Sequence, residues 1–365
     1  MTMRLIDRRV FLKAAGASFM ASLSPQSLHA VEAADAVFAT AYQRRDGAYG
    51  VAVLSEDRKI VFSADLPERG HDVTFDPVSQ RAVVFARRPG TFAVVFDHTE
   101  RKQPLTIPSI DGRHFFGHGV FSPDGKLLYA TENDFENAAG MIGVYDASDG
   151  FRRVGEFPTH GMDPHELLLM PDGRTLVIAN GGIETHPDFG RAKLNLTTMK
   201  PSLVFIDRIS GDLIEEHLLP PALHQLSIRH MDIDAGGAVW FGCQYEGPAS
   251  DRPLLVGKAK PGSDLTLIDM PQDVLGGLRN YVGSVAANPG AGTVAVSSPQ
   301  GNSMAIIDVA TSEIRSSLSL KEVCGLAPDQ SAFMATTGTG EIVDPKGEAV
   351  DMQDYVWDNH LLRIM

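Results

Sequence analysis

Histidines recur at the starts of short apolar segments of this chain. His165 and Glu166 precede a run of leucines, and four further histidines stand in comparable places, at His71, His118, His230 and His360. Neutral imidazoles, with a carboxylate such as Glu166 beside them, are suitable ligands for first-row transition metals such as iron, copper or zinc. The pattern predicts a metal site, with iron or copper as the ion, if the fold brings these six residues together.

Two other interpretations of these residues stay open. Histidine and glutamate can act as acid and base on a small substrate. Alternatively, the histidines can hydrogen-bond to loops and to water in a polar channel. No compact ligand spacing such as His-Glu-x-x-His occurs in the sequence, so the residue types alone do not decide among the three.

Regularly spaced turns identify the elements that must position the histidines. Segments such as Ser122–Gly125 and Met170–Gly173, both ending in Pro-Asp-Gly, each separate two short apolar strands, and no convincing amphipathic helix occurs. This pattern predicts an all-β fold of the propeller type. Six innermost strands begin near His71, His118, His165, His230, Ser284 and Cys324. Their intervals of about 40 to 65 residues compare with the ~40 to 50 of a propeller blade.

The two ends of the chain complete the predicted ring. Three strands, at 37–43, 50–54 and 60–66, lack an inner neighbour, while Trp357–Ile364 has the pattern of an inner strand without a blade after it. Pairing them predicts a seventh blade, so that residues 31–365 form one seven-bladed propeller closed by the C-terminal strand.

The inner strands of a propeller all begin at one mouth of the central channel, where the histidines should converge. Relative to the following turn, His118 and His230 fall one residue later than His71 and His165. A shift of one residue reverses the direction of a strand side chain, so two or three rings are expected to meet. Further histidines precede these strands and are expected over the same mouth: His114, His160 and His224.

A polar insertion at 183–200 accounts for the longest interval between inner strands. Long loops of compact domains tend to carry function, and this one contains His186, Arg191 and Lys193. These three residues are candidates for binding a cofactor, because Arg and Lys can hold a carboxylate, a phosphate or a haem propionate. Pairing with nearby acidic side chains is the alternative.

The N-terminal 30 residues have the pattern of a twin-arginine signal peptide. Arg8 and Arg9 precede Phe11-Leu12-Lys13 and a weakly apolar run, which predicts export to the periplasm. No later segment has the ~18 to 20 apolar residues of a membrane span. The net charge of −14 argues against nucleic acid and anionic membranes as partners. Cys243 and Cys324 can pair or remain buried thiols, and their placement in different blades favours thiols.

Four segments of the chain also carry a family resemblance: 112–119 (GRHFFGHG), 160–166 (HGMDPHE), 184–191 (ETHPDFGR) and 226–232 (LSIRHMD). Together they resemble a family of twin-arginine-exported periplasmic propeller proteins of unknown function, often encoded beside imelysin-like iron-uptake proteins and a dihaem oxidoreductase-like protein. The resemblance implies a role in iron acquisition, with imelysin-like or haem-bearing periplasmic proteins as partners. It implies no catalytic residue, because the family has no established activity.

Three functions follow as hypotheses. The first is an accessory protein of iron or other transition-metal acquisition, which binds a metal, a metal complex or a partner protein at a histidine-rich funnel. The second is a small-molecule enzyme, either a lactonase-like hydrolase or an oxidoreductase. The third is an interaction scaffold without chemistry of its own.

Overall fold

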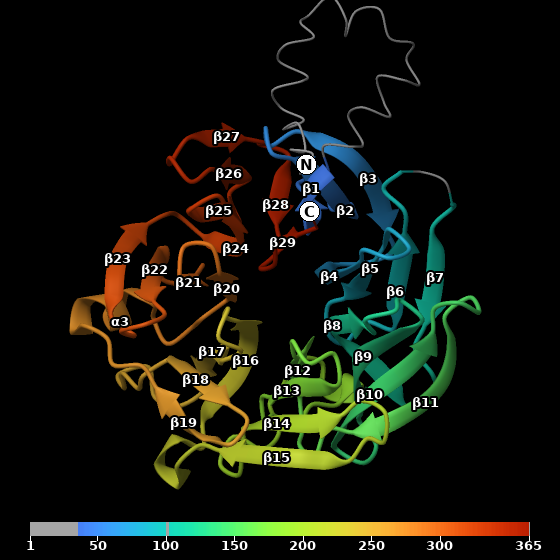
Figure 1. Ribbon diagram of the computed structural model, residues 1–365, viewed down its shortest axis with the longest axis horizontal. Helices are drawn as coiled ribbons and strands as arrows, with labels where there is room; N and C mark the ends of the chain where they lie inside the picture. Colours follow the sequence, from blue (N-terminus) through green and yellow to red (C-terminus); the bar gives the residue numbers. More distant parts are fainter. Residues whose placement is uncertain (1–35, 100–101, 365) are drawn as a thin grey trace, which may run out of the picture.

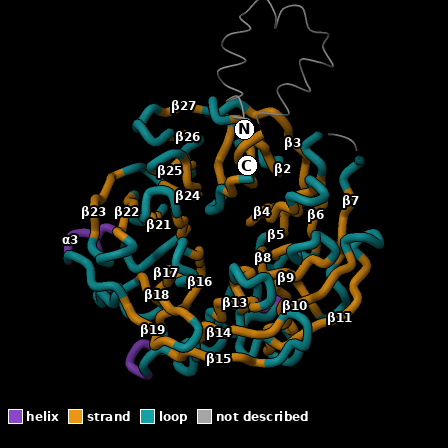
Figure 2. Tube along the Cα trace, viewed as in Figure 1, coloured by secondary structure: helices purple, strands orange, loops and turns teal. Residues whose placement is uncertain are grey.

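Seven antiparallel sheets surround a central channel in the computed structural model, which describes residues 36–99 and 102–364 (Figure 1). Strands and loops make up nearly all of the described chain (Figure 2). The seven-bladed propeller predicted from the turns is therefore confirmed. The predicted signal peptide at 1–30 lies outside the described residues.

Six of the sheets contain four strands that follow chain order from the channel outward (Figure 1). The first of these sheets contains β4 (Gly70–Asp76), β5 (Arg81–Ala86), β6 (Phe92–Phe96) and β7 (Leu105–Pro108). The second contains β8 (Arg113–Phe121), β9 (Leu127–Asp134), β10 (Ala139–Asp146) and β11 (Arg152–Pro158). The third contains β12 (Pro164–Leu169), β13 (Thr175–Asn180), β14 (Ser202–Asp207) and β15 (Leu213–Leu218). The fourth sheet contains β16 (Leu226–Ile233), β17 (Val239–Tyr245), β18 (Val256–Lys260) and β19 (Ser263–Leu267). The fifth contains β20 (Ser284–Asn288), β21 (Thr293–Ser298), β22 (Ser303–Asp308) and β23 (Ile314–Ser319). The sixth contains β24 (Val323–Asp329), β25 (Ala332–Thr337), β26 (Glu341–Val343) and β27 (Ala349–Asp351).

The seventh sheet joins the two ends of the chain. β1 (Ala36–Arg44), β2 (Tyr49–Ser55) and β3 (Ile60–Leu66) come from the N-terminal side, and β28 (Tyr355–Trp357) and β29 (Leu362–Arg363) both pair with β1. The predicted closing strand is thus interrupted between residues 357 and 362. The fully buried Trp357 ring donates a hydrogen bond from Nε1 to the Gly340 carbonyl and anchors the closure.

Burial along the strands explains why the sequence forms sheets of this kind. The middle strands β13 and β14 are buried at every position, because each is covered by a neighbouring blade on both faces. The outer strand β11 alternates between exposed and partly buried residues. Aspartates end many strands and hold the following turn: Asp207 Oδ1 accepts from the Ile209 amide at 2.8 Å.

Helical structure is limited to short connections in the described residues. They are η1 (Pro187–Phe189), η2 (Pro221–Leu223) and α3 (Gln272–Gly277). None of the helices in these parts of the chain is long and apolar enough to cross a membrane. The insertion at 183–200 connects β13 to β14, as predicted. Cys243 in β17 and Cys324 in β24 are buried free thiols.

Candidate metal centre

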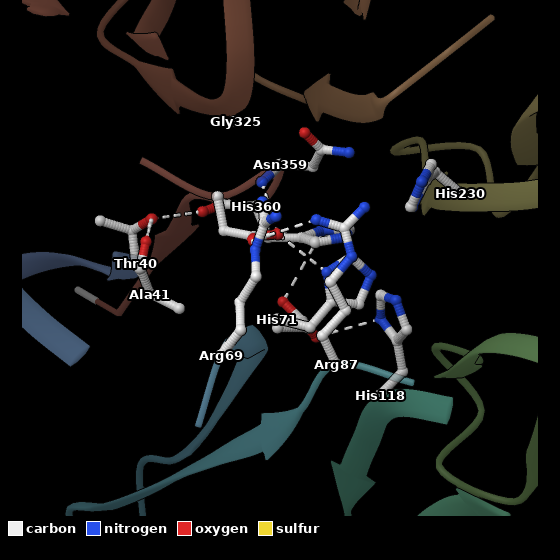
Figure 3. Close-up of polar contacts among 12 residues, drawn as sticks. Thr40, Ala41, Arg69, His71, Arg87, His118, His230, Gly325, Asn359 and His360 are labelled. Atoms are coloured by element: carbon white, nitrogen blue, oxygen red, sulfur yellow. Dashed lines mark hydrogen bonds and ion pairs between the residues drawn. The ribbon is translucent and has the colours of Figure 1, made fainter. Parts of the chain in front are cut away.

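Five histidine rings meet in the central channel. They come from β4, β8, β12, β16 and the link between β28 and β29, that is, from five different blades: His71, His118, His165, His230 and His360. The centroids of neighbouring rings lie from 4.6 Å (His71 to His360) to 6.3 Å (His71 to His230) apart. We refer to these five residues as the histidine cluster; four of them are labelled in Figure 3.

Irregular pairing of the inner strands turns these rings toward the channel. His71, His118 and His165 each lie where the register with the next strand shifts. In β16 the shift falls at Arg229, directly before His230. Such β-bulges redirect side chains and are common beside functional sites. They bring His118 and His230 into line with the others, so all five rings meet rather than the two or three expected.

The segment before His118 also requires a glycine. Gly117 has a φ of 105°, and a Cβ atom there would lie 2.5 Å from Cδ2 of His71. A side chain at this position is therefore excluded both by the backbone conformation and by the neighbouring ring. Gly117 lets two inner strands approach closely enough for His71 and His118 to touch.

Asp358 orients His71 from the interruption of the closing strand. Its Oδ1 lies 2.9 Å from His71 Nδ1, while Oδ2 accepts from Arg69 Nε at 2.7 Å and from Arg87 Nη1 at 3.5 Å (Figure 3). Burial alone raises the pKa of a carboxyl group, but the hydrogen bond to His71 and the charges of both arginines hold the pKa of Asp358 far below its usual range. Asp358 is therefore an anion that accepts a hydrogen bond from His71 Nδ1.

Two further carboxylates face the other rings. Asp72 lies between His118, at 3.3 Å from its Nδ1, and His360, at 3.8 Å from its Nδ1. Glu166 Oε2 lies 3.4 Å from His230 Nδ1. An ionised carboxylate at Nδ1, as Asp72 provides, favours the tautomer whose Nε2 lone pair is free, the arrangement found behind many metal-binding histidines. Burial raises the pKa of Glu166, so this group supports His230 less strongly.

Several ring nitrogens are buried without a hydrogen-bond partner among the described residues. This holds for Nε2 of His118, His165 and His360, and for Nδ1 of His118 and His230, whose contacts with the nearby carboxyl groups are not hydrogen bonds. Two groups of three rings each offer nitrogen atoms that all lie within 4.8 Å of one another: His71, His118 and His165, and His118, His230 and His360. Buried nitrogens left without a hydrogen bond are costly. A metal ion would satisfy those of His118 and His360, whereas Nδ1 of His165 accepts from Arg229 and its Nε2 therefore carries the proton.

Burial also sets the protonation state of the rings. It lowers the pKa of His71 to about 4, although the hydrogen bond to Asp358 acts in the opposite direction. Burial and the neighbouring imidazoles lower the pKa values of His165, His230 and His360 well below the usual range. These rings are neutral at pH 7, which is the form that binds metal.

A cavity of about 300 Å³ adjoins the histidine cluster and is lined by His71, His165 and His230. Arg191 and Lys193 of the insertion line it as well, so the structure brings these two predicted residues to the cluster. His186 does not line this cavity; its ring packs against Phe135 and lies 3.9 Å from Glu136 Oε1. The sequence analysis predicted one cofactor-binding group of His186, Arg191 and Lys193, but only the arginine and the lysine line this cavity.

The three histidines expected above the cluster lie elsewhere. His114 is inside β8, where its ring stacks on Phe135 and its Nε2 lies 2.9 Å from the Asn133 amide nitrogen. His160 is exposed and His224 is half-buried at the end of η2. None of the three lines the cavity.

Several residues of the site were missed from the sequence: Asp358, Arg69, Arg87, Arg88 and Arg229. Signals for some of them existed. Asp358 stands two residues before His360, Arg229 directly precedes His230, and the two arginines at 87–88 follow β5 where it returns to the channel mouth. The sequence does not show which partners these charges meet, because the contacts join different blades.

The chain belongs to the family described as protein of unknown function (DUF1513), whose profile matches residues 64–364. No curated protein matches it in sequence. Among solved structures, hydrazine synthase of Kuenenia stuttgartiensis is similar with a TM-score of 0.60 and 16% identity, covering 88% of this chain and 94% of that chain. The Cps50 (Swd1) β-propeller domain of Myceliophteria thermophila is similar with a TM-score of 0.57 and 12% identity, covering 89% and 96%. At such identities the likeness concerns the fold alone.

Proposed function

We propose that this member of a family of unknown function binds a transition-metal ion at its histidine cluster. The observation that carries the proposal is that five imidazole rings converge and that several of their nitrogens are buried without a hydrogen-bond partner among the described residues. Nδ1 of four rings faces a carboxyl group, and the Nε2 atoms of two of these rings, His118 and His360, have no partner among the described residues. This is the donor set and outer shell typical of iron, copper or zinc sites.

Iron is the proposed ion, and iron acquisition in the periplasm is the proposed setting. Imidazole nitrogens suit iron, copper and zinc alike, so the choice of iron depends on the resemblance to exported proteins encoded beside iron-uptake components. In this role the propeller is an accessory protein that holds the ion, or a complex of it, for transfer to an imelysin-like or haem-bearing partner. The twin-arginine pattern before Ala36 supports the periplasmic location.

Metal analysis of protein purified from cells tests the proposal. The test variant replaces His118, His230 and His360 by alanine, and the exposed His160→Ala is the matched control. We expect about one metal ion per chain in the wild-type protein and in the control, and almost none in the triple variant. Circular dichroism and urea unfolding of each protein establish that all three are folded.

The single variant His118→Gln provides the test if the triple variant does not fold. It should fold, because glutamine is a polar side chain of similar size. It should bind metal more weakly in competition titrations. Metal content that is near zero in the wild-type protein, or equal in all variants, would reject the proposal. Separate titrations with Fe²⁺, Cu²⁺ and Zn²⁺ test the choice of ion: tightest binding of Zn²⁺ with no iron in protein from cells would contradict a role in iron handling.

A further inference from the structure

Cations gather around the cavity beside the histidine cluster. Its lining includes four arginines and one lysine: Arg87, Arg88, Arg191, Arg229 and Lys193. The only carboxylate in the described lining is that of Glu246. The chain as a whole has a net charge of −14, so this concentration of positive charge runs against the composition of the protein. Fields of one sign inside a concave site attract small ions of the opposite sign.

The ion pairs of the cavity leave part of this positive charge uncompensated. Arg88 and Arg229 share one carboxylate, Asp163, at 3.2 and 2.9 Å. Lys193 pairs with Glu246. Each of these carboxylates is thus already engaged by at least one cation.

Two arginines have weaker compensation or none. Arg87 Nη1 is 3.5 Å from Asp358, whose oxygens already accept from His71 and Arg69. Arg191 lines the cavity and is exposed, and it forms no hydrogen bond or ion pair with the described residues. Although Arg191 is exposed overall, its partial enclosure by the cavity and the charges of Arg87 and Arg69 lower its pKa, which agrees with an excess of positive charge around it.

His165 adds a neutral donor to this wall of the cavity. Arg229 Nη1 lies 3.2 Å from His165 Nδ1. A guanidinium group only donates hydrogen bonds, so Nδ1 accepts and the proton of the neutral ring is on Nε2. That Nε2 atom is buried and unpartnered among the described residues. His165 therefore differs from the four rings that face carboxylates: it presents an N–H group rather than a lone pair.

We infer that the cavity binds a small oxyanion with two or more carboxylate or phosphate groups, held by Arg87, Arg191 and the Nε2–H group of His165. Planar guanidinium groups bind carboxylates and phosphates through paired hydrogen bonds. The volume of about 300 Å³ lies at the lower end of ligand pockets and suits a molecule of the size of a di- or tricarboxylate. Its role as a neighbour of the bound metal depends on the proposed function, whereas the anion site itself does not.

Calorimetric titration of metal-free protein with citrate, and separately with inorganic phosphate, tests the inference. Arg191→Gln is the test variant because its side chain is exposed and lacks a partner, so the fold should be preserved. Arg152→Gln is the matched control: it removes an exposed arginine of β11 that pairs with Asp149 on an outer strand. Charged hydrogen bonds of this kind correspond to roughly a tenfold or larger loss of affinity when removed.

Binding of either anion to the wild-type protein and the control, weakened about tenfold or more in Arg191→Gln, supports the inference. Tighter binding of citrate identifies a carboxylate ligand, and tighter binding of phosphate a phosphate ligand. Binding of neither anion, or equal affinities in all three proteins, overturns it. Because the protein is metal-free, failure of the proposed metal site would leave this result unchanged, and the two proposals can fail separately.

Discussion

Acid should destabilise the metal-free protein through His71. The pKa of this ring is about 4 in the folded protein, against the usual 6.5 of an exposed histidine, chiefly because the ring is buried. Between these two pH values the unfolded chain binds a proton that the folded protein does not, so the free energy of unfolding falls as the pH falls. Linkage with these two pKa values gives a loss of about 1 kcal/mol for His71 between pH 7.5 and pH 5.5.

Some neighbouring groups also destabilise the folded protein in acid and others stabilise it. The total pH dependence of the free energy of unfolding therefore does not identify the contribution of His71. His165, His230 and His360 also have lowered pKa values and act in the same direction as His71. Burial raises the pKa of Glu166 well above its usual range and that of Asp232 to about 6. These two carboxyl groups take up protons in the folded state first and therefore stabilise it as the pH falls.

A comparison with His71→Gln isolates the contribution of one ring. Glutamine retains an amide donor for Asp358 but cannot be protonated. Urea unfolding in the presence of a chelator is measured at pH 7.5 and pH 5.5 for both proteins, with the exposed His160→Gln as control. Acidification should shift the stability difference by about 1 kcal/mol in favour of His71→Gln. A difference that stays constant, or that shifts toward the wild-type protein, would refute the assignment of His71 as a buried neutral ring.

Three further changes probe the supports of the site. Asp72→Asn removes the carboxylate that faces two cluster rings, and competition titrations should show metal affinity about 10- to 100-fold lower; unchanged affinity would contradict this outer-shell role. Gly117→Ala should lower the urea midpoint more than Gly150→Ala, because both positions have positive φ but only the first would place a Cβ against His71; equal losses would contradict the steric argument. Trp357→Ala should reduce the free energy of unfolding by about 3 to 5 kcal/mol, since the ring is buried at the closure, and a loss below about 1 kcal/mol would show that the closing strand adds little.

The fold was predictable because its signals are local and repeated. Pro-Asp-Gly turns and apolar strands recur at blade spacing, and the unmatched strand near Trp357 identified the closure. The convergence of all five histidines was only partly predictable. Counting from the turns placed His118 and His230 one residue out of step. The bulges that correct the register lie in the pairing of each inner strand with the next strand of its own blade, and the turn spacing does not show them. The pairing of Asp358 with His71 joins two different blades, so it could not be read from the chain either.

Closure of the ring and assembly of the site depend on the same short segment. The break between β28 and β29 contains both Asp358, which accepts from His71, and His360, which joins the histidine cluster. The Thr40 hydroxyl donates to the His360 carbonyl at 2.6 Å and holds this segment to β1 (Figure 3). If residues 357–362 formed a regular strand, it would pair with β1 along its whole length, and Asp358 and His360 would be held in that pairing instead of reaching the histidine cluster. An ion held by rings from several blades would therefore link the closing segment to distant parts of the ring. Any ligand that binds only the folded state stabilises it, by about 2.7 kcal/mol at a concentration 100 times its Kd, and here that stabilisation would act directly on the joint between the two ends of the chain.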